Sequence, residues 1–476
     1  MKVQIVGKNI ELVLEWMLNN SHWIASSVEV QNIPGWMSVT MSVIFALLWT
    51  ITMLPHTLIV RNVCLVLGAL LGAYVVVKNS KLLLKKQALP IWLIFSLFIW
   101  ISWHLLFIGS DYDSQLSEFQ SIWKRAALGS LFAIGFGIAV VREKTIKCWL
   151  ILLAGFAMPI LIYGFKYLLT FCADNYGINT PDYLRLYYTN TDFYVPKISY
   201  IFFCLPVFGL ALGQLEDSQD EFLSQFPWLK AVYLFFSFGV LSIFLSIHAK
   251  NGMAYSLVLG ILFVVMNFKK IISKRLIWIL LIISGLSFFI WAHVQKNESW
   301  IYIAADFKAA VKANPNTGDG AFVLDGPYPT NELGVPVHPE NYVRFAWGLK
   351  ALDLIKELPL GYGVIQDSFG RLMKEKWPLT KLGQSHSGWL DLALGIGIPG
   401  VVIIIFAAFL AIKNSLILTP PWRSFVPWFL GSSMLLLVST EVAQKDYLET
   451  FIYLIVFAAA LSLGSQLANL NRVNLS

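Results

Sequence analysis

Long runs of apolar residues, separated by short polar stretches, dominate the chain from about residue 37 onward. A helix that crosses a bilayer needs roughly 20 predominantly apolar residues. Twelve runs are of about that length, so we predict an all-α polytopic membrane protein with about twelve transmembrane helices. A transmembrane β-barrel is excluded, because its strands alternate apolar and polar residues over only about ten positions. The predicted spans are residues 37–55, 61–77, 89–109, 125–141, 147–171, 198–214, 228–247, 251–268, 275–296, 386–411, 425–442 and 446–467.

A different pattern precedes the first run. Between Ile10 and Leu18, apolar residues recur at the spacing of a helix, while Glu11 and Glu15 fall on the opposite face. Such an amphipathic pattern is typical of a helix that lies on the membrane surface. We therefore predict an N-terminal interfacial segment over residues 1–36.

The rest of the chain divides at one long interruption of the apolar pattern. Nine predicted spans occupy residues 37–296, and three more with a tail occupy residues 386–476. Between them lies a large loop, residues 297–385, whose first half is rich in turn-forming residues. Its second half predicts a helix over about 342–358. We expect any activity on the water-soluble side of the protein to lie in this loop.

The composition agrees with a membrane protein. Hydrophobic residues make up 57% of the chain and charged residues only 13%, against about 25% charged residues in soluble globular proteins. These values exclude a soluble Rossmann or barrel enzyme. The four cysteines lie in or beside apolar spans and form no CxxC pair, so we interpret them as small buried hydrophobic residues.

The excess of basic residues predicts the orientation. Lys and Arg number 35 against 28 Asp and Glu, a net charge of +7, and in membrane proteins such an excess marks cytoplasmic loops. If the spans alternate, the basic loops fall on one side, which predicts cytoplasmic termini and an outer position for the large loop. The charge forms no single soluble patch, so no nucleic-acid partner is predicted. The basic loop residues are Lys78, Lys81, Lys85, Lys86, Arg142, Lys144, Lys147, Lys269, Lys270, Lys274, Arg275, Lys413 and Arg423.

His386 is the strongest catalytic candidate. It lies in Ser385-His386-Ser387, at the start of the tenth predicted span, where Ser385 can cap the helix that follows. The positive end of a helix dipole disfavours the imidazolium ion. His386 is therefore expected to be neutral, as a general base must be. The alternative is an interfacial histidine that hydrogen-bonds a loop carbonyl.

Two basic residues on the outer side are candidate ligands for phosphate. Arg344 lies near the start of the loop helix, where a guanidinium and free backbone N–H groups suit phosphate oxygens. His338 and Tyr342 precede it and are candidate supporting residues. Lys250 occupies a short turn between two spans, which holds its ammonium at the outer membrane boundary. The alternatives are a solvated arginine and a lysine that reaches the interface for structural reasons.

Two further charged residues have less specific surroundings. Arg185 lies among three tyrosines, which suits a cation–π or carbohydrate-binding cluster, with an aromatic belt at the interface as the alternative. Asp391 falls inside the tenth span, about one and a half turns from its start. Intramembrane carboxylates are candidates for functional sites, so Asp391 and the neighbouring Ser385 are further supporting candidates. Asp391 also keeps a transporter among the hypotheses.

A metal site has only weak support. Asp111-Tyr112-Asp113 has the spacing of carboxylates that hold Mg²⁺ beside a diphosphate, but this short pattern occurs often by chance. The chain contains no Walker loop, GxSxG elbow or HExxH motif. The sequence therefore does not indicate ATP-driven transport, serine hydrolysis or zinc proteolysis, and we predict neither a metal nor another cofactor.

Three motifs near the loop and the tenth span resemble a known family. They are Arg344-Phe-Ala-Trp347, Leu354-Ile355-x-x-x-Pro359-Leu-Gly-Tyr-Gly363 and His386-Ser-x-x-Leu390-x(4)-Gly395-x-Gly397-x-x-Gly400. Together with about twelve spans and one long outer loop, they resemble the O-antigen ligase and polymerase superfamily. The compact His-Ser element and the single large loop are more similar to the ligases than to the polymerases.

The resemblance implies a GT-C-like fold and an inverting, metal-independent glycosyltransferase of the bacterial inner membrane. Such an enzyme transfers polysaccharide from undecaprenyl diphosphate, the donor, to lipid A-core oligosaccharide, the acceptor, at the periplasmic face during lipopolysaccharide biosynthesis. His386 corresponds to the histidine that activates the acceptor hydroxyl, and Arg344 and Lys250 to basic residues that hold the diphosphate, with Arg185 as a third candidate. Lys250 departs from the arginine common in the family, because lysine lacks the bidentate fork of donors.

Other functions remain open at this point. An O-antigen polymerase or a protein O-glycosylating ligase would use the same chemistry with another acceptor. A transporter or flippase belongs to a different class, and such proteins usually place charges near the bilayer midplane. A structural membrane scaffold is the remaining alternative.

Overall fold

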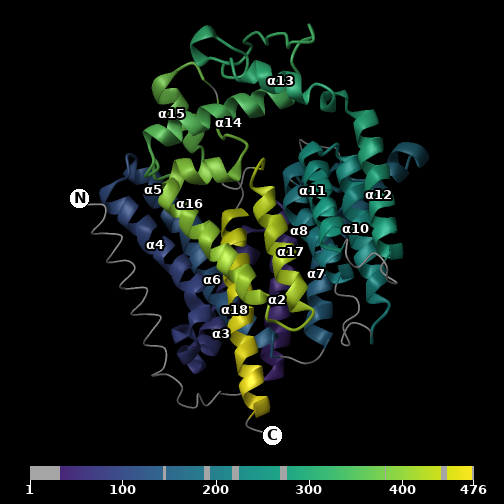
Figure 1. The fold of residues 1–476 in the computed structure, drawn as a ribbon, viewed down its shortest axis with the longest axis vertical. Helices are drawn as coiled ribbons and strands as arrows, with labels where there is room; N and C mark the ends of the chain where they lie inside the picture. The colour runs from purple at the N-terminus through teal and green to yellow at the C-terminus, as the bar shows by residue number, and fades with distance from the viewer. Residues whose placement is uncertain are drawn as a thin grey trace.

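The computed structural model describes residues 33–142, 146–186, 193–216, 225–267, 276–380, 382–440 and 447–473 (Figure 1). Within these ranges, a helix lies at each of the twelve positions where the apolar runs predict a span. They are α2 Gly35–Met53, α3 Leu58–Lys78, α4 Leu89–Phe107, α6 Lys124–Val140, α7 Ile146–Tyr176, α8 Lys197–Glu216, α10 Leu229–Ser246, α11 Lys250–Asn267, α12 Leu276–Lys296, α16 Gly388–Ser415, α17 Trp422–Leu436 and α18 Tyr447–Val473. Residues 1–32 of the predicted interfacial segment lie outside the described residues.

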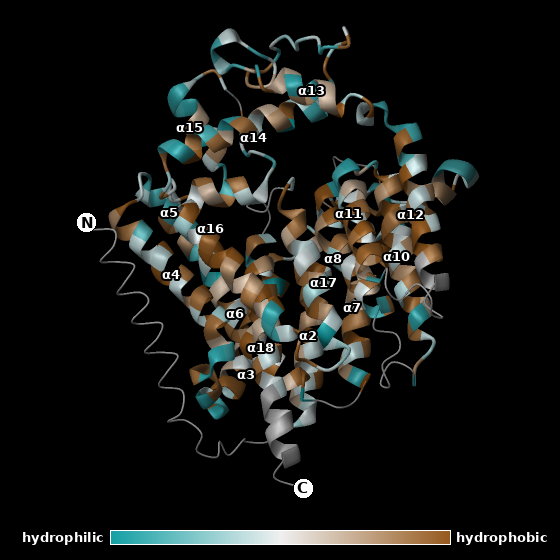
Figure 2. Cartoon of the chain, in the orientation of Figure 1, coloured by the Kyte–Doolittle hydropathy of each residue, from teal (hydrophilic) through white to brown (hydrophobic). Residues whose placement is uncertain are grey.

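The described helices confirm a polytopic membrane protein. Ten of the helices or joined helical stretches in the described ranges are long and apolar enough to cross a bilayer. In the cartoon coloured by hydropathy, the brown of apolar residues predominates along these helices (Figure 2). The other two predicted spans are shorter by this measure. α17 has only 15 residues, and the apolar stretch of α12 is Leu280–Lys296. Both lie against neighbouring long helices.

Two helices form the centre of the bundle. α8 and, over Tyr447–Ser465, α18 are almost completely buried, with α17 packed on α8 and α6 packed on α18. Close packing in membranes depends on small residues, because lipid supplies no hydrophobic driving force between helices. At the contact of α3 with α6, a side-chain carbon added to Gly135 would lie 2.3 Å from the Cα of Gly72. These two glycines therefore set the distance between α3 and α6.

α17 ends earlier than the sequence predicts. The predicted span covers 425–442, whereas the helix runs over Trp422–Leu436. Residues 437–440 leave the helix, and the carbonyls of Leu437 and Thr440 accept hydrogen bonds from the backbone N–H groups of Trp389 and Gly388. Non-helical backbone inside a membrane protein persists where protein groups satisfy it. The end of α17 is thereby joined to the start of α16.

α16 is broken at Gly397, in a stretch that also contains Pro399. Gly397 has φ 75° and ψ 172°, outside the helical region. The segment 359–363 fills this break: Tyr362 and Gly363 donate to the carbonyls of Leu394 and Gly395 at 2.6 and 2.7 Å, and Ile398 donates to Pro359 at 2.9 Å. These bonds satisfy backbone groups that the break exposes. They also attach the Pro359–Gly363 motif rigidly to α16.

The long connection between α12 and α16 lies at one end of the membrane helices (Figure 1). It contains the helices α13 Ile303–Ala310, α14 Pro339–Glu357 and α15 Ser368–Lys376. α14 confirms the helix predicted over 342–358 and begins three residues earlier, because Pro339 occupies the first turn, where proline is favoured. α14 packs on both α13 and α16. The connection therefore covers the membrane helices that carry the candidate residues.

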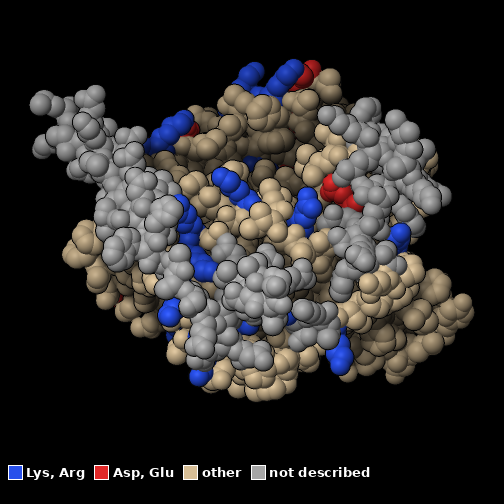
Figure 3. All heavy atoms as spheres, turned by 60° about the horizontal axis from the view of Figure 1, so that its bottom comes forward, with Lys and Arg blue, Asp and Glu red and all other residues tan. Residues whose placement is uncertain are grey.

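Figure 3 views the end of the molecule opposite this connection, where Lys and Arg side chains outnumber acidic ones on the visible face. Lys78, Lys81, Lys85 and Lys86, at the end of α3 and in the two short helices that follow, are among the basic residues predicted to face the cytoplasm. The side of the membrane that each end meets stays a prediction.

Candidate functional site

A cavity of about 640 Å³ lies between the long connection and the membrane helices. Its walls come from α8, α11, α13 and α14, from the turn before α11, from the turn that leads into α16, and from residues 438–440. The polar and charged lining residues are Lys197, His248, Lys250, Asn251, Tyr255, Glu340, Asn341, Arg344, Ser385, His386, Ser387, Ser439 and Thr440. The apolar ones include Ile198, Ile201, Ile303, Phe307, Phe345, Leu349 and Leu352.

The cavity brings together the principal residues predicted from the sequence. Lys250, Arg344, Ser385 and His386 all line it, although Lys250 and His386 are 136 positions apart in the chain. The sequence alone predicts that they share one side of the membrane, and the structure shows that they share one cavity.

His386 lies in a strained backbone conformation. Its φ is 61°, in the left-handed region that non-glycine residues rarely adopt. The imidazole stacks on the indole of Trp347, with ring centroids 4.9 Å apart and planes inclined by 14°. In this parallel stack the indole covers a face of the imidazole and not the ring edge that carries the two nitrogens. Strained residues held by their surroundings are typical of functional sites.

Asp391 holds the turn that carries His386. The carboxylate is buried, and its Oδ1 accepts hydrogen bonds from the backbone N–H of Ser385 at 2.9 Å and from the Ser385 hydroxyl at 2.7 Å. The prediction that Ser385 caps the helix is therefore wrong. The helix begins at Gly388, and the residue at its N-cap position is Ser387. Ser385 instead donates its hydroxyl to Asp391, in the first turn of the helix.

We expect Asp391→Asn to retain at least about a third of any catalytic activity, because an amide oxygen can still accept both bonds from Ser385. Asp391→Leu removes the acceptor and leaves buried donors unpaired, which costs about 1–3 kcal/mol of unfolding free energy. Activity assays and thermal unfolding in detergent measure both effects. If Asp391→Asn abolishes function while His386→Ala preserves it, the carboxylate carries an ion or proton, as in a transporter.

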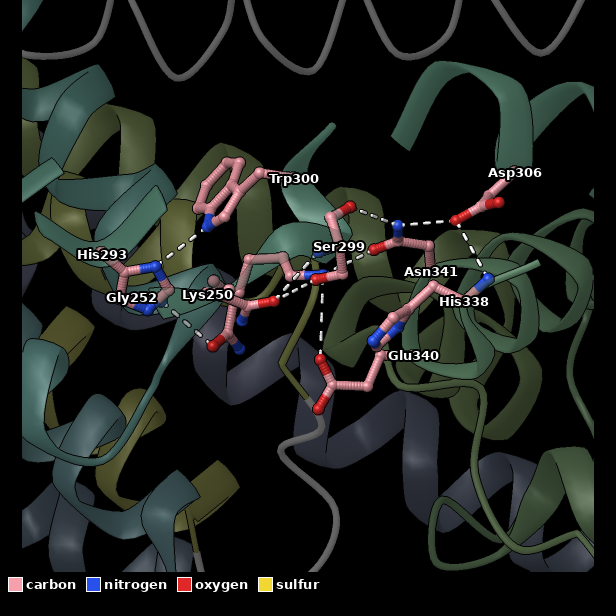
Figure 4. A network of polar contacts seen from close by, with 11 residues as sticks. Lys250, Gly252, His293, Ser299, Trp300, Asp306, His338, Glu340 and Asn341 are labelled. Atoms are coloured by element: carbon pink, nitrogen blue, oxygen red, sulfur yellow. Dashed lines mark hydrogen bonds and ion pairs between the residues drawn. The ribbon is translucent and has the colours of Figure 1, made fainter. Parts of the chain in front are cut away.

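Lys250 and Arg344 place two cations at the cavity. Lys250 is the first residue of α11, and its Nζ donates to Asn341 Oδ1 at 2.7 Å and lies 3.8 Å from a Glu340 carboxylate oxygen (Figure 4). Arg344 lies one turn further along α14 and is close enough to Lys250 for the two charges to interact. Among the described residues, no side chain hydrogen-bonds or ion-pairs with the Arg344 guanidinium. Its donors are therefore available to an anionic ligand.

Three other predicted residues lie outside the described lining of this cavity. Arg185 lies in the connection between α7 and α8, and its guanidinium is 3.9 Å from the carboxylate of Asp174 in α7. His338 caps α14 and donates its backbone N–H to Asp306. The Tyr342 hydroxyl donates to Asp319, and burial together with this carboxylate raises the pKa of the phenol. Tyr342 is thus turned into the long connection, away from the two cations.

The Asp111-Tyr112-Asp113 pattern also has another explanation. Asp111 caps α5 Tyr112–Glu118, accepts the backbone N–H of Ser114, and pairs with Arg371 at 2.7 Å. The hydrogen bonds from Ser114 are the main cause of a lowered pKa at Asp111, with Arg371 adding to the effect. Among the described residues, no group of three or more His, Cys, Asp or Glu side chains has the geometry to hold a metal ion.

Sequence reasoning missed three residues of this site. Asn341 contacts Lys250 directly, Trp347 stacks on His386, and Asp306 lies behind Asn341. Trp347 belongs to a motif that the sequence singles out, but the motif does not reveal its stacking partner. Asp306 and Asn341 have no distinguishing local pattern, since their roles depend on contacts between separate elements.

Comparison with protein families, with curated proteins and with solved structures finds no match to this chain.

Proposed function

We propose that this protein is an O-antigen ligase. It transfers polysaccharide from undecaprenyl diphosphate to lipid A-core oligosaccharide at the periplasmic face of the bacterial inner membrane. One observation supports this proposal above the others: Lys250, Arg344 and His386, from three separate parts of the chain, line one cavity at an end of the membrane helices. Two cations beside a histidine suit a diphosphate leaving group and a general base.

The lining of the cavity suits an amphipathic donor. Ile198 and Ile201 of α8 belong to a membrane helix, and Leu349 and Leu352 of α14 add apolar surface opposite. A polyprenyl diphosphate presents an apolar tail and a strongly anionic headgroup. Such a ligand requires apolar surface for its tail and fixed cations for its headgroup, and the lining of this cavity offers both kinds of residue.

In the proposed reaction, a hydroxyl of the acceptor sugar attacks the anomeric carbon of the donor sugar in line with the leaving group. The bond between the acceptor oxygen and this carbon forms while the bond to the phosphate oxygen breaks, which inverts the anomeric configuration. His386 takes the hydroxyl proton. Arg344 and Lys250 stabilise the charge that develops on the diphosphate, so the mechanism requires no metal.

Purified protein supplied with a lipid-linked glycan and one of three acceptors tests this proposal. We expect product when the acceptor is lipid A-core. Product with a pilin protein instead would identify a protein O-glycosylating ligase, and extension of the donor alone would identify a polymerase. The ligase proposal fails if lipid A-core is never modified.

The same assay tests the absence of a metal requirement. Because two cations neutralise the diphosphate in the proposed mechanism, we expect transfer to persist in excess EDTA. We expect Asp113→Ala to retain activity as well, since Asp111 is engaged by Arg371 and Ser114. Loss of activity in both experiments would support a metal-dependent reaction.

A further inference from the structure

Asp306 is a buried charge that the mechanism does not use directly. It lies in α13 and has no exposed surface. A buried carboxylate is costly unless hydrogen bonds and opposite charges compensate for lost hydration. Its position therefore requires a specific set of partners.

The partners of Asp306 come from the turn before α14 and from the start of that helix. Oδ1 accepts a hydrogen bond from the Asn331 amide at 3.0 Å. Oδ2 accepts from the backbone N–H of His338 at 3.3 Å and from the amide of Asn341 at 2.8 Å (Figure 4). The carboxylate thus holds the first turn of α14 against α13.

These contacts determine which way the Asn341 amide faces. Its Nδ2 donates both to Asp306 and to the backbone carbonyl of Ser299 at 2.8 Å. An amide has two donor hydrogens on nitrogen and an acceptor oxygen on the other side. With the nitrogen bound to two acceptors, the oxygen must face Lys250, whose ammonium it accepts at 2.7 Å.

We propose that Asp306 is a positioning residue that acts through Asn341 to fix the ammonium of Lys250 at the anion site of the cavity. Its role in glycan transfer rests on the function proposed above. The arrangement also gives a reason for lysine at this position. The single oxygen of Asn341 accepts one N–H of the ammonium, which leaves two N–H donors for the Glu340 carboxylate and for a ligand.

Asp306 also contributes its charge. Its carboxylate attracts the Lys250 ammonium from the far side of Asn341. Asp306→Asn keeps an oxygen that can accept from Asn341 but removes the charge, whereas Asn341→Ala removes the direct contact with Lys250. Asn331→Ala is the matched control, because it deletes a hydrogen bond to the same carboxylate on the side away from Lys250.

The test measures reductive methylation of Lys250 in the full-length protein by mass spectrometry, with exposed Lys356 in the last turn of α14 as internal reference. Loss of a hydrogen bond to a charged group frees the amine. We expect Asn341→Ala to raise the labelling rate of Lys250 at least about fivefold, Asp306→Asn to raise it about two- to fivefold, and Asn331→Ala to leave it within about twofold. Inorganic pyrophosphate should slow the labelling of Lys250 in the wild type.

A transfer assay gives the second measurement. Asn341→Ala should raise KM for the lipid-linked donor about tenfold and change kcat less than about threefold, as expected for lost ligand binding. Unchanged labelling in either Asn341→Ala or a folded Asp306→Asn overturns the inference, as does an equal change in Asn331→Ala, which would indicate general loosening of the connection. If Asp306→Asn does not fold, Asn341→Ala decides.

The two proposals can fail separately. Altered labelling of Lys250 and protection by pyrophosphate, without transfer to any acceptor, would support the positioning role and contradict the ligase. Transfer to lipid A-core with unchanged labelling would support the ligase and contradict the positioning role.

Discussion

Replacement of His386 by alanine is expected to slow glycan transfer by about 10²- to 10⁴-fold, the usual contribution of a general base. Without the imidazole, no other described side chain in the turn before α16 can accept the hydroxyl proton at neutral pH. The binding of donor should change little, because Lys250 and Arg344 remain. Initial rates with lipid-linked glycan and lipid A-core measure the effect. In a deletion strain, complementation with the variant should fail to restore the lipopolysaccharide banding pattern.

Trp347 supplies a matched control for this experiment. Trp347→Phe keeps an aromatic face against the imidazole, although it loses the hydrogen bond from the indole to the carbonyl of Ala321. We expect the Phe variant to retain most of the activity that His386→Ala loses. A His386→Ala enzyme that works at near wild-type rate would exclude the histidine as the base.

Replacement of Arg344 by alanine should reduce transfer by about 10²- to 10³-fold, the loss typical of removing one group that stabilises developing charge. Arg344→Lys should recover only part of this loss, because an ammonium keeps the charge but cannot bind two phosphate oxygens as a planar fork does. The rate constants and the KM for donor separate the contribution to the transition state from that to binding.

The control for Arg344 is another arginine of the same connection. Arg371 pairs with Asp111 and lies outside the described lining of the cavity. We expect Arg371→Ala to lower stability modestly, since partly exposed ion pairs contribute about 0–1 kcal/mol, and to leave the transfer rate within severalfold. If Arg344→Ala is no slower than Arg371→Ala, the guanidinium does not act on the diphosphate.

The membrane helices were predictable because the signal for a span is local. A run of apolar residues must be buried in lipid or protein whatever its neighbours are, so the positions of the twelve helices follow from the chain alone. The end of α17 was not predictable. It stops at Leu436 because the carbonyls beyond it bond to the start of α16, a contact between segments about 50 residues apart in the chain.

The candidate site was likewise predictable from the sequence only in part. His386 and Arg344 were identified by residue type, motif and predicted side of the membrane, and both line the cavity. Arg185 met similar criteria but lies beside Asp174, because an aromatic-rich loop does not determine where its cation points. The capping role expected of Ser385 failed for a related reason: the buried Asp391 competes successfully for its hydroxyl.

The sequence by itself determined that this chain is a polytopic, helical membrane protein, and which basic residues and histidine are candidates for a polar site, since hydropathy and residue chemistry are properties of short segments. Only the tertiary structure decided which of those residues meet. The stacking of His386 on Trp347 and the path from Asp306 through Asn341 to Lys250 join elements distant in the chain. Such contacts depend on how helices pack and on which buried donors find acceptors, and no local pattern encodes that choice.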